Sequence, residues 1–338
     1  MRAVKLDCSN GGGQVLRTGL ALSTILKTPV EFDNIRASRP KPGLQAQHLA
    51  GVKALEKMGG KTKYAAIGSQ KMIFNPPEKI DFGKINIDIG TAGSITLVMQ
   101  TLLLPLAFSG AKRTVEIKGG THVAWSPPFE HFEKVFLPAA AKFGVRAECV
   151  LKKHGFYPQG GGVVEITVHP CKQLKPVELL KRGKLKSIEG ISAVANLPIE
   201  IAGRQKKSSL NTLAVQNVSL KIQSKTVDAS GQGTYVFLQA NYEHGNAGFS
   251  ALGEKGKPAE RVGEEVARKF LEFQTSDYAV DEHLGDQLIP LTALAQGKSV
   301  IRAKKTEHLL SNASACEKLL GVKFSISETV EVEGKGML

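Results

Sequence analysis

The sequence predicts an α+β fold of three repeated split βαβ units, each a four-stranded sheet with two helices, plus a small inserted α/β domain. Two observations predict it. One succession of helix, strand, helix and strands occurs three times along the 338 residues, and a segment with its own strands and helix separates the second copy from the third. A chain of this length is also too long for one ordinary hydrophobic core, which agrees with a repeated architecture.

The first part of each copy is an apolar helix followed by a short strand. Each version opens on a glycine-rich or acidic turn and continues with apolar residues at helical spacing. After a break, β-branched residues predict the strand. The three versions span 11–37, 90–120 and 281–306, and their strands are PVEF, RTVEI and SVIRA.

The second part of each copy is an amphipathic helix that stops at a glycine and is followed by strands. The three versions are GLQAQHLAGVKALEKMGGKTKYAAI, PFEHFEKVFLPAAAKFGVRAECV and TEHLLSNASACEKLLGVKFSISE. In each, the glycine falls just after the last periodic residue, where a left-handed cap is favoured. A further strand, KMIFN, GVVEITV or TVEVE, closes each copy, so its helices can cover one face of a four-stranded sheet.

The repeats predict three segments of chain. Repeats one and two of a large domain occupy 1–180, an inserted small α/β domain occupies 181–276, and repeat three of the large domain occupies 277–338. The inserted segment contains the predicted strands SAVANLP, SLKIQSK and TYVFLQANY and the predicted helix PAERVGEEVARKFLEF. We expect an ordered domain there because a loop of that length without structure is uncommon in a compact protein.

The composition indicates a soluble protein with an anionic partner. The net charge of +14 favours nucleic acid, a nucleotide or an acidic membrane, while a basic surface that only aids solubility fits the charge equally well. The four cysteines form no CxxC pair, so we expect free thiols rather than a cysteine zinc site or disulfides. The N-terminal stretch has no secretory signal, and the apolar stretch SITLVMQTLLLPLAFSG is short for a membrane span. We therefore expect a cytoplasmic protein in which that stretch is a buried helix.

Glycine-rich turns precede two predicted helices. In NGGGQVLR, Gln14 and Arg17 lie in the first turns of the helix. Backbone N–H groups at a helix start and a nearby guanidinium suit a phosphate group, while a plain tight turn explains the glycines equally well. In DIGTAGSITLVMQ, a second such turn leads into the apolar helix that carries Gln100. The amide of Gln100 needs a hydrogen-bond partner on that apolar face, and packing is its default role.

A basic loop precedes another predicted helix. Arg36, Arg39 and Lys41 lie in the loop of NIRASRPKPGLQAQHL, and Gln47 and His48 lie on the helix that follows. The two prolines stiffen the loop and reduce the entropy lost when its charges are fixed. We therefore favour binding of a phosphate or an RNA end over a merely solvated basic loop.

The third copy contains an acidic helix start and a histidine. Asp281, Glu282 and Asp286 lie near the start of the helix in DEHLGDQLIP, where acids suit the helix dipole. Asp286 would also suit a ribose hydroxyl or a metal. In KKTEHLLSNASACEKLLG, Thr306 is the expected N-cap, which places His308 in the first turn. A helix N-terminus favours the neutral imidazole, which is the form that can attack a phosphorus atom.

Six motifs together resemble a known family. The chain resembles the RNA 3′-terminal phosphate cyclases, of archaeal and bacterial type, over nearly its whole length. The resemblance implies three split βαβ repeats and a small inserted domain, the same arrangement that the repeats predict. The motifs, in the order and spacing of that family, are GGGQVLRT, IRASRPKPGLQAQHL, GTAGSITLVMQTLL, HGFYPQGGG, HLGDQL and HLLSNA.

The resemblance implies an activity and its substrates. Members of the family use ATP and a divalent metal, Mg²⁺ or Mn²⁺, to convert an RNA 3′-terminal phosphate to a 2′,3′-cyclic phosphate. The implied intermediates are a covalent histidyl-AMP and an RNA-(3′)pp(5′)A end. Such covalent catalysis divides one difficult dehydration into displacements that each have a good leaving group. The expected partners are ATP and RNA with a 3′-phosphate end, without a membrane, and whether the chain forms a homodimer is left open.

The resemblance also implies roles for individual residues. His308 is the implied nucleophile that becomes adenylated. Arg17 and Gln100 would hold the ATP phosphates, Asp286 the nucleoside, and Pro127 with His283 the adenine. The full set of implied ATP-binding residues is Gln14, Arg17, Gln100, Pro127, His283 and Asp286. The implied binding residues for the RNA 3′-phosphate are Arg36, Arg39, Gln47 and His48.

The sequence departs from the family pattern near the implied metal. The family usually has a glutamate before the glycine run, as in GEGGGQ, and that glutamate is implied to help hold the metal; Asn10 takes its place here. A neutral amide oxygen should bind Mg²⁺ more weakly than a carboxylate, and Asp7 is an alternative carboxylate. His122 replaces an acid that is common in GGTD, and His283 stands where an aromatic ring is often found.

Two other functions fit parts of the sequence. A non-catalytic, cyclase-like factor in RNA processing or ribosome assembly would share the fold but lose the nucleophile, whereas His308 is present. An enolpyruvyl transferase would share the repeated βαβ units but need a phosphoenolpyruvate site of paired lysines and arginines. The motif around His308 would have no role in that enzyme.

Overall fold

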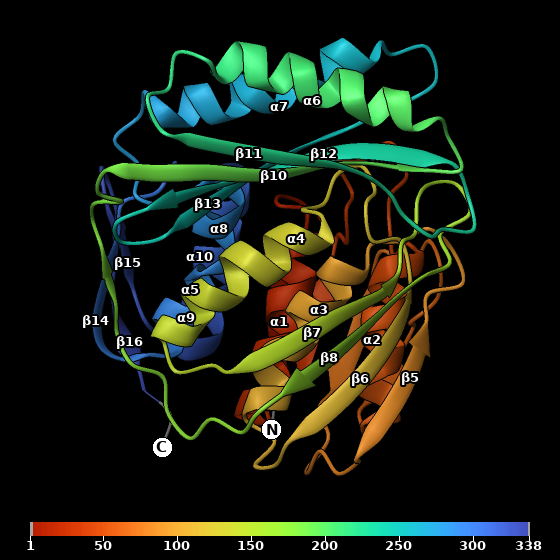
Figure 1. The fold of residues 1–338 in the computed structure, drawn as a ribbon. Coiled ribbons are helices and arrows are strands. Elements are labelled where there is room, and N and C mark those ends of the chain that lie inside the picture. The colour runs from red at the N-terminus through yellow and green to blue at the C-terminus, as the bar shows by residue number, and fades with distance from the viewer. Residues whose placement is uncertain (1–2, 337–338) are drawn as a thin grey trace.

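The computed structural model describes residues 3–336 and contains four four-stranded sheets (Figure 1). In each of the three repeats, the first strand pairs in parallel with the second, and the other two strands add on in antiparallel. The strand orders are β1-β2-β4-β3, β5-β6-β8-β7 and β9-β14-β16-β15. This shared order confirms the α+β class and the repeated split βαβ units.

Repeat one supplies the glycine run and the basic loop. Its glycine run leads directly into α1, and its basic loop joins β2 to α2. The buried side chains of Leu6, Phe32 and Phe74 alternate along its strands and pack under the two helices. Its elements are β1 (Val4–Asp7), α1 (Gly13–Leu26), β2 (Val30–Asp33), α2 (Ala46–Lys57), β3 (Lys61–Lys63) and β4 (Met72–Asn75).

Repeat two supplies the most apolar helix. The stretch SITLVMQTLLLPLAFSG forms α3, nearly all of whose side chains are buried, which confirms the predicted core helix. Pro105 lies within its last turn. The elements are β5 (Lys84–Asp88), α3 (Ile95–Ala107), β6 (Arg113–Gly119), the continuous helix of α4 (Phe129–His131), η1 (Phe132–Phe136) and α5 (Leu137–Lys142), β7 (Ala147–Lys153) and β8 (Gly162–Val168).

Repeat three is interrupted by the inserted segment. Its first strand, β9 (Glu178–Leu179), precedes the insertion and pairs in parallel with β14. The predicted range of 277–338 for this repeat therefore lacks its short first strand. The later elements are α8 (Glu282–Gln287), α9 (Ile289–Leu294), β14 (Gln296–Ile301), α10 (Glu307–Leu320), β15 (Phe324–Ile326) and β16 (Val330–Lys335).

The inserted segment forms a sheet with the order β11-β10-β12-β13. Helices α6 and α7 cover one face, and the other face is turned toward the large domain (Figure 1). Buried residues such as Val236, Val266 and Phe270 form a separate core, whereas Tyr235 and Phe237 join the core of the large domain. Its elements are β10 (Leu185–Ala195), α6 (Ile199–Leu213), β11 (Ser219–Thr226), β12 (Gly233–Tyr242), β13 (Asn246–Leu252) and α7 (Ala259–Gln274).

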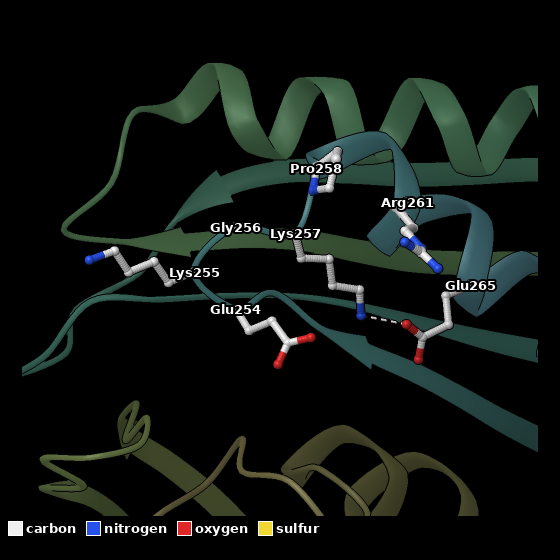
Figure 2. A pocket seen from close by; sticks show the side chains of 7 residues that line it. All are labelled: Glu254, Lys255, Gly256, Lys257, Pro258, Arg261 and Glu265. Carbon is white, nitrogen blue, oxygen red and sulfur yellow. Dashed lines mark hydrogen bonds and ion pairs between the residues drawn. The ribbon is translucent and has the colours of Figure 1, made fainter.

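A surface hollow lies on the inserted segment, ahead of α7 (Figure 2). Lys257 contacts the carboxylate of Glu265 and donates to the carbonyl of Leu252 at 3.1 Å, so its charge is already paired. None of the predicted site residues lines this hollow, whose residues are Glu254, Lys255, Gly256, Lys257, Pro258, Arg261 and Glu265. We assign it no chemistry.

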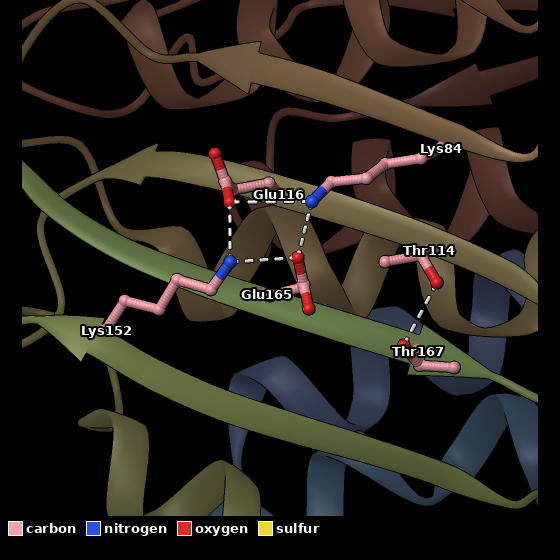
Figure 3. Close-up of polar contacts among 6 residues, drawn as sticks. All are labelled: Lys84, Thr114, Glu116, Lys152, Glu165 and Thr167. Carbon is pink, nitrogen blue, oxygen red and sulfur yellow. Dashed lines mark hydrogen bonds and ion pairs between the residues drawn. The ribbon is translucent and has the colours of Figure 1, made fainter.

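The outer face of the repeat-two sheet bears a ladder of paired charges (Figure 3). Lys152 contacts Glu116 at 2.8 Å and Glu165 at 2.9 Å, and Lys84 contacts Glu165 at 2.6 Å. Charges on this face belong to a sheet that is covered by helices on the other side only. The helices of the three repeats face inward, because α1 of repeat one packs against both α3 of repeat two and α10 of repeat three.

Two further expectations concern the cysteines and the membrane. All four cysteines are free, with Cys8 and Cys316 buried and Cys149 and Cys171 partly exposed. Within residues 3–336, no helix combines the length and the apolar character that a membrane crossing requires.

Candidate active site

His308 lies in the first turn of α10. The hydroxyl of Thr306 accepts a hydrogen bond from the N–H of Leu309 at 3.0 Å, which confirms Thr306 as the N-cap. At the other end of the helix, Gly321 has the left-handed conformation of a C-cap. The imidazole of His308 is about half exposed, so a substrate can reach it.

A carboxylate from a neighbouring helix orients the His308 ring. The Nδ1 atom of His308 lies 3.5 Å from Oδ2 of Asp286, a buried residue of α8. Asn312 of α10 donates to the backbone carbonyl of Asp286 at 2.8 Å, and its Oδ1 accepts from the Thr18 hydroxyl of α1 at 2.5 Å. Contact with Asp286 through Nδ1 leaves Nε2 as the ring atom available for attack. Three helices thus hold the nucleophile candidate in place.

The glycine run is the point at which α10, α2 and the basic loop approach α1. A Cβ atom on Gly11 would lie 2.2 Å from Oγ of Ser311, and one on Gly13 would lie 2.2 Å from Nε2 of His48. The guanidinium of Arg39 lies beside Gly12. Gly11 and Gly12 both have positive φ. Motifs that are far apart in the sequence therefore meet around the start of α1.

A narrow cavity between α1, α3, η1 and the α8–α9 segment contains unpaired polar atoms. Within residues 3–336, the buried atoms Nε of Arg17, Nε2 of Gln100 and Oε1 of Gln287 have no hydrogen-bond partner. Buried polar groups are normally paired, so these atoms indicate a polar ligand or ordered water. The lining residues are Gln14, Arg17, Thr18, Ala21, Gln100, Leu103, Leu104, Phe136, Gln287, Pro290 and Leu291.

Arg17 remains cationic in this cavity. Burial lowers the pKa of Arg17 to about 10, against the opposing effect of Asp286, so the guanidinium is charged near neutral pH. Its Nη2 atom contacts Oε1 of Gln14. The buried cation and the unpaired N–H of the Gln100 amide suit the oxygens of a phosphate chain. Gln287 also lines the cavity, where its unpaired Oε1 atom is an acceptor. The sequence did not predict this residue, and only its position beside Asp286 could have indicated it.

His48 is a buried neutral donor. Its Nδ1 atom accepts a hydrogen bond from the N–H of Gln45 at 3.1 Å. Burial, together with the charges of Arg17 and Arg36, lowers the pKa of His48 to about 3. The neutral ring therefore carries its proton on Nε2, which lies next to Gly13.

Of the other residues predicted to bind the RNA 3′-phosphate, two make hydrogen bonds within the protein and one is exposed. Nη1 of Arg36 donates to the carbonyls of Lys41 at 2.6 Å and Gly43 at 3.1 Å, so this group holds the loop together. Gln47 accepts from the N–H of Ser94 at 3.1 Å and links repeat one to repeat two. The side chain of Arg39 is exposed. Of this set, Arg39 and His48 are best placed to contact an incoming anion.

Pro127, His283 and Asn10 lie on three other segments of the chain. Pro127 is buried, and its carbonyl accepts from the hydroxyl of Thr96 at 2.8 Å. His283 is exposed on α8, with its ring centroid 5.7 Å from that of His131. Asn10 is also exposed.

The protonation of His48 predicts a pH effect on stability. Because its folded-state pKa lies below its usual value of 6.5, the unfolded chain binds a proton first as the pH falls. The free energy of unfolding should therefore decrease below about pH 6.5, by at most about 1.4 kcal/mol per pH unit for this group. In urea denaturation at pH 7 and pH 5, His48→Asn, which retains an acceptor for Gln45, should lose less stability than the wild type. Equal losses would contradict the buried neutral state.

The repeated fold and the polar atoms around the start of α1 define the class: a repeated α+β protein with a site suited to phosphate groups. A family model described as RNA 3′-terminal phosphate cyclase matches residues 8–326. Curated relatives of that name come from Pyrococcus abyssi (40% identical; 96% of this chain and 95% of the relative), Pyrobaculum aerophilum (41%; 99% and 99%) and Archaeoglobus fulgidus (41%; 95% and 97%). The chain belongs to the RNA 3′-terminal phosphate cyclase family, which confirms the resemblance.

Proposed function

We propose that the chain is an ATP-dependent RNA 3′-terminal phosphate cyclase that acts through a covalent histidyl-AMP on His308. The carrying observation is the placement of His308, which is accessible in the first turn of α10 with Asp286 at its Nδ1 atom. This arrangement presents Nε2 as a nucleophile next to the glycine-rich start of α1. The relatives of the same name support the overall reaction, and the net charge of +14 suits an RNA substrate.

In the first step, Nε2 of His308 attacks the α-phosphorus of ATP. A P–N bond forms, the bond to the β-phosphate oxygen breaks, and pyrophosphate leaves. Arg17 and Gln100, with unpaired donors on the cavity wall, would hold the phosphate oxygens and stabilise the charge that develops on them. Asp286 would keep the ring oriented and stabilise the imidazolium character that His308 gains.

In the later steps, the RNA end takes the AMP and then expels it. An oxygen of the RNA 3′-phosphate attacks the phosphorus of histidyl-AMP, and His308 leaves to give RNA-(3′)pp(5′)A. The neighbouring 2′-hydroxyl then attacks the RNA phosphorus, loses its proton and displaces AMP, which leaves the 2′,3′-cyclic phosphate. Arg39 and Nε2–H of His48 would bind the terminal phosphate, because both lie at the glycine run near α10.

A divalent metal, Mg²⁺ or Mn²⁺, fits this site only as a companion of ATP. Asn10 offers a neutral amide oxygen, and the carboxylate of Asp7 already accepts hydrogen bonds from Ser9 and Asn34. Mg²⁺ can be held by few protein ligands together with substrate phosphates and water. When bound, the metal would neutralise phosphate charge, with Asn10 as its protein ligand.

Asn10→Glu should reduce the metal requirement. A carboxylate in place of the amide adds charge to the metal site, so the Mg²⁺ concentration for half-maximal cyclisation should fall by about tenfold, or about 1.4 kcal/mol. The measurement is a Mg²⁺ titration at fixed ATP, with Asn10→Gln as the control that changes side-chain length and not charge. An unchanged requirement in Asn10→Glu would place the metal elsewhere.

An RNA that ends in a 2′-deoxynucleoside 3′-phosphate tests the whole scheme. It lacks the attacking hydroxyl, so it should accumulate the adenylated end, whereas the matched ribose substrate should be cyclised. The alternative function is a non-catalytic, cyclase-like factor in RNA processing or ribosome assembly. The retained His308 favours catalysis, and a chain that binds RNA but alters neither substrate would favour that alternative.

A further inference from the structure

A second group of chemically active side chains lies at the junction between repeat two and the inserted segment. His122 follows β6, Glu130 lies in α4, and His154 follows β7. One potential ligand atom from each lies within 4.8 Å of the others, and no other group of three such residues occurs within 3–336. His122 and Glu130 are buried, and His154 is partly exposed. The proposed cyclase steps use none of the three.

The outer atoms of two of these side chains are already held in place. The Thr121 hydroxyl oxygen accepts from the N–H of Gly155 at 2.9 Å and lies within hydrogen-bond distance, 2.8 Å, of Nδ1 of His122. Oε1 of Glu130 accepts from the hydroxyl of Tyr235 at 2.5 Å. Metal-binding histidines and carboxylates characteristically have such supporting hydrogen bonds on their outer atoms.

The two inner atoms are joined by a hydrogen bond in this structure, and a third donor lies beside them. Nε2 of His122 lies 2.7 Å from Oε2 of Glu130, the distance of a hydrogen bond between an imidazole N–H and a carboxylate. A metal ion bound here would replace the proton between the two atoms, which would move apart to become its ligands. The hydrogen bond needs only these two atoms. His154, whose ring is stacked on that of His122 with centroids 5.2 Å apart, supplies a third donor, as a metal site requires.

We propose that His122, Glu130 and His154 form a binding site for a transition metal ion of the Zn²⁺ type. Two imidazoles and one carboxylate form a donor set typical of Zn²⁺, and a fourth position remains for water on the exposed side of His154. Tyr235 comes from β12 of the inserted segment, and the N–H of His154 donates to the carbonyl of Asp228 at 3.0 Å. A bound ion would therefore stabilise the junction between the two parts of the chain.

Zinc binding by the tag-free full chain tests the proposal without ATP or RNA. After dialysis against a chelator, the protein is titrated with Zn²⁺, and bound metal is counted by mass spectrometry. We expect one tightly bound Zn²⁺ per wild-type chain and at least about tenfold weaker binding by His154→Ala. His169→Ala is the matched control because His169 also lies beside a glutamate, Glu148 at 3.4 Å, but has no third ligand. It should bind as the wild type does.

Two more measurements distinguish Zn²⁺ binding at this site from binding by cysteine thiols, and a lost ligand from a misfolded variant. Co²⁺ in place of Zn²⁺ should give a visible absorption band without a thiolate charge-transfer band, because no cysteine is a ligand. If His154→Ala proves unfolded by circular dichroism, Tyr235→Phe, which removes only the hydrogen bond to Glu130, should weaken binding by about tenfold. Wild-type protein without stoichiometric Zn²⁺, a thiolate band, or a folded His154→Ala that binds as tightly as the wild type would each overturn the proposal.

Discussion

A His308→Ala chain is expected to take up no label from ATP that carries radioactive α-phosphate, and its cyclisation rate should fall by at least about 10³-fold. Alanine removes the only protein atom that the proposed scheme uses as a nucleophile, so the first covalent bond cannot form. The fold should persist because the His308 side chain is about half exposed and the Thr306 cap is retained. The measurement is incubation with Mg²⁺ or Mn²⁺, followed by a denaturing gel.

Chemical lability and a matched variant make this result specific. A phosphoramidate on the wild type should be labile to acid and stable to alkali. His169→Ala, which removes another partly exposed imidazole beside a carboxylate, should be labelled normally. Label on His308→Ala would place the nucleophile elsewhere. If the wild type cyclises RNA but never acquires label, the covalent intermediate is refuted. If the wild type neither acquires label nor cyclises RNA, the non-catalytic alternative is favoured.

The repeats were predictable because their helices bury apolar faces at regular spacing, and two parts of the fold without that signal were not. Helix α6 buries Gln205 and Ser209, and Gly263 of α7 packs closely on the backbone at Gln205. Contacts made by small and polar residues leave no apolar stripe in the sequence. Strand β9 is also too short to show a pattern, although its pairing with β14 places it in repeat three.

Those parts of the candidate site that depend on neighbouring residues in the sequence were predictable. The N-cap at Thr306 can be inferred from neighbouring residues alone, and it places His308 in its turn. Contacts between distant segments leave no such local signal. Gln287 was missed for that reason, and so was the group of His122 with its two partners, whose members are separated by a strand and helices.

Gly11→Ala is expected to be the most damaging change in the site that leaves every predicted functional side chain intact. Gly11 has φ +75°, which costs a residue with a Cβ atom about 1–2 kcal/mol. The new Cβ atom would also lie 2.2 Å from Oγ and 2.4 Å from Cβ of Ser311, so α10 must move away from α1. Such overpacking adds about 1–3 kcal/mol. Because His308 lies on α10, adenylation should fall by about 10²-fold or more, as expected when a catalytic group is displaced by about 1 Å.

Gly110→Ala separates the two contributions to this loss. Gly110 has a similar φ of +81°, but a Cβ atom there would have no heavy atom within 4 Å. In urea denaturation it should show only the backbone cost, with adenylation unchanged. Adding Ser311→Gly to Gly11→Ala removes both overlapping atoms and should restore adenylation in part. The opposite result would be a Gly11→Ala chain that is as stable and as active as Gly110→Ala. It would show that α10 does not pack closely on the glycine run, and it would contradict the placement of His308 beside the start of α1.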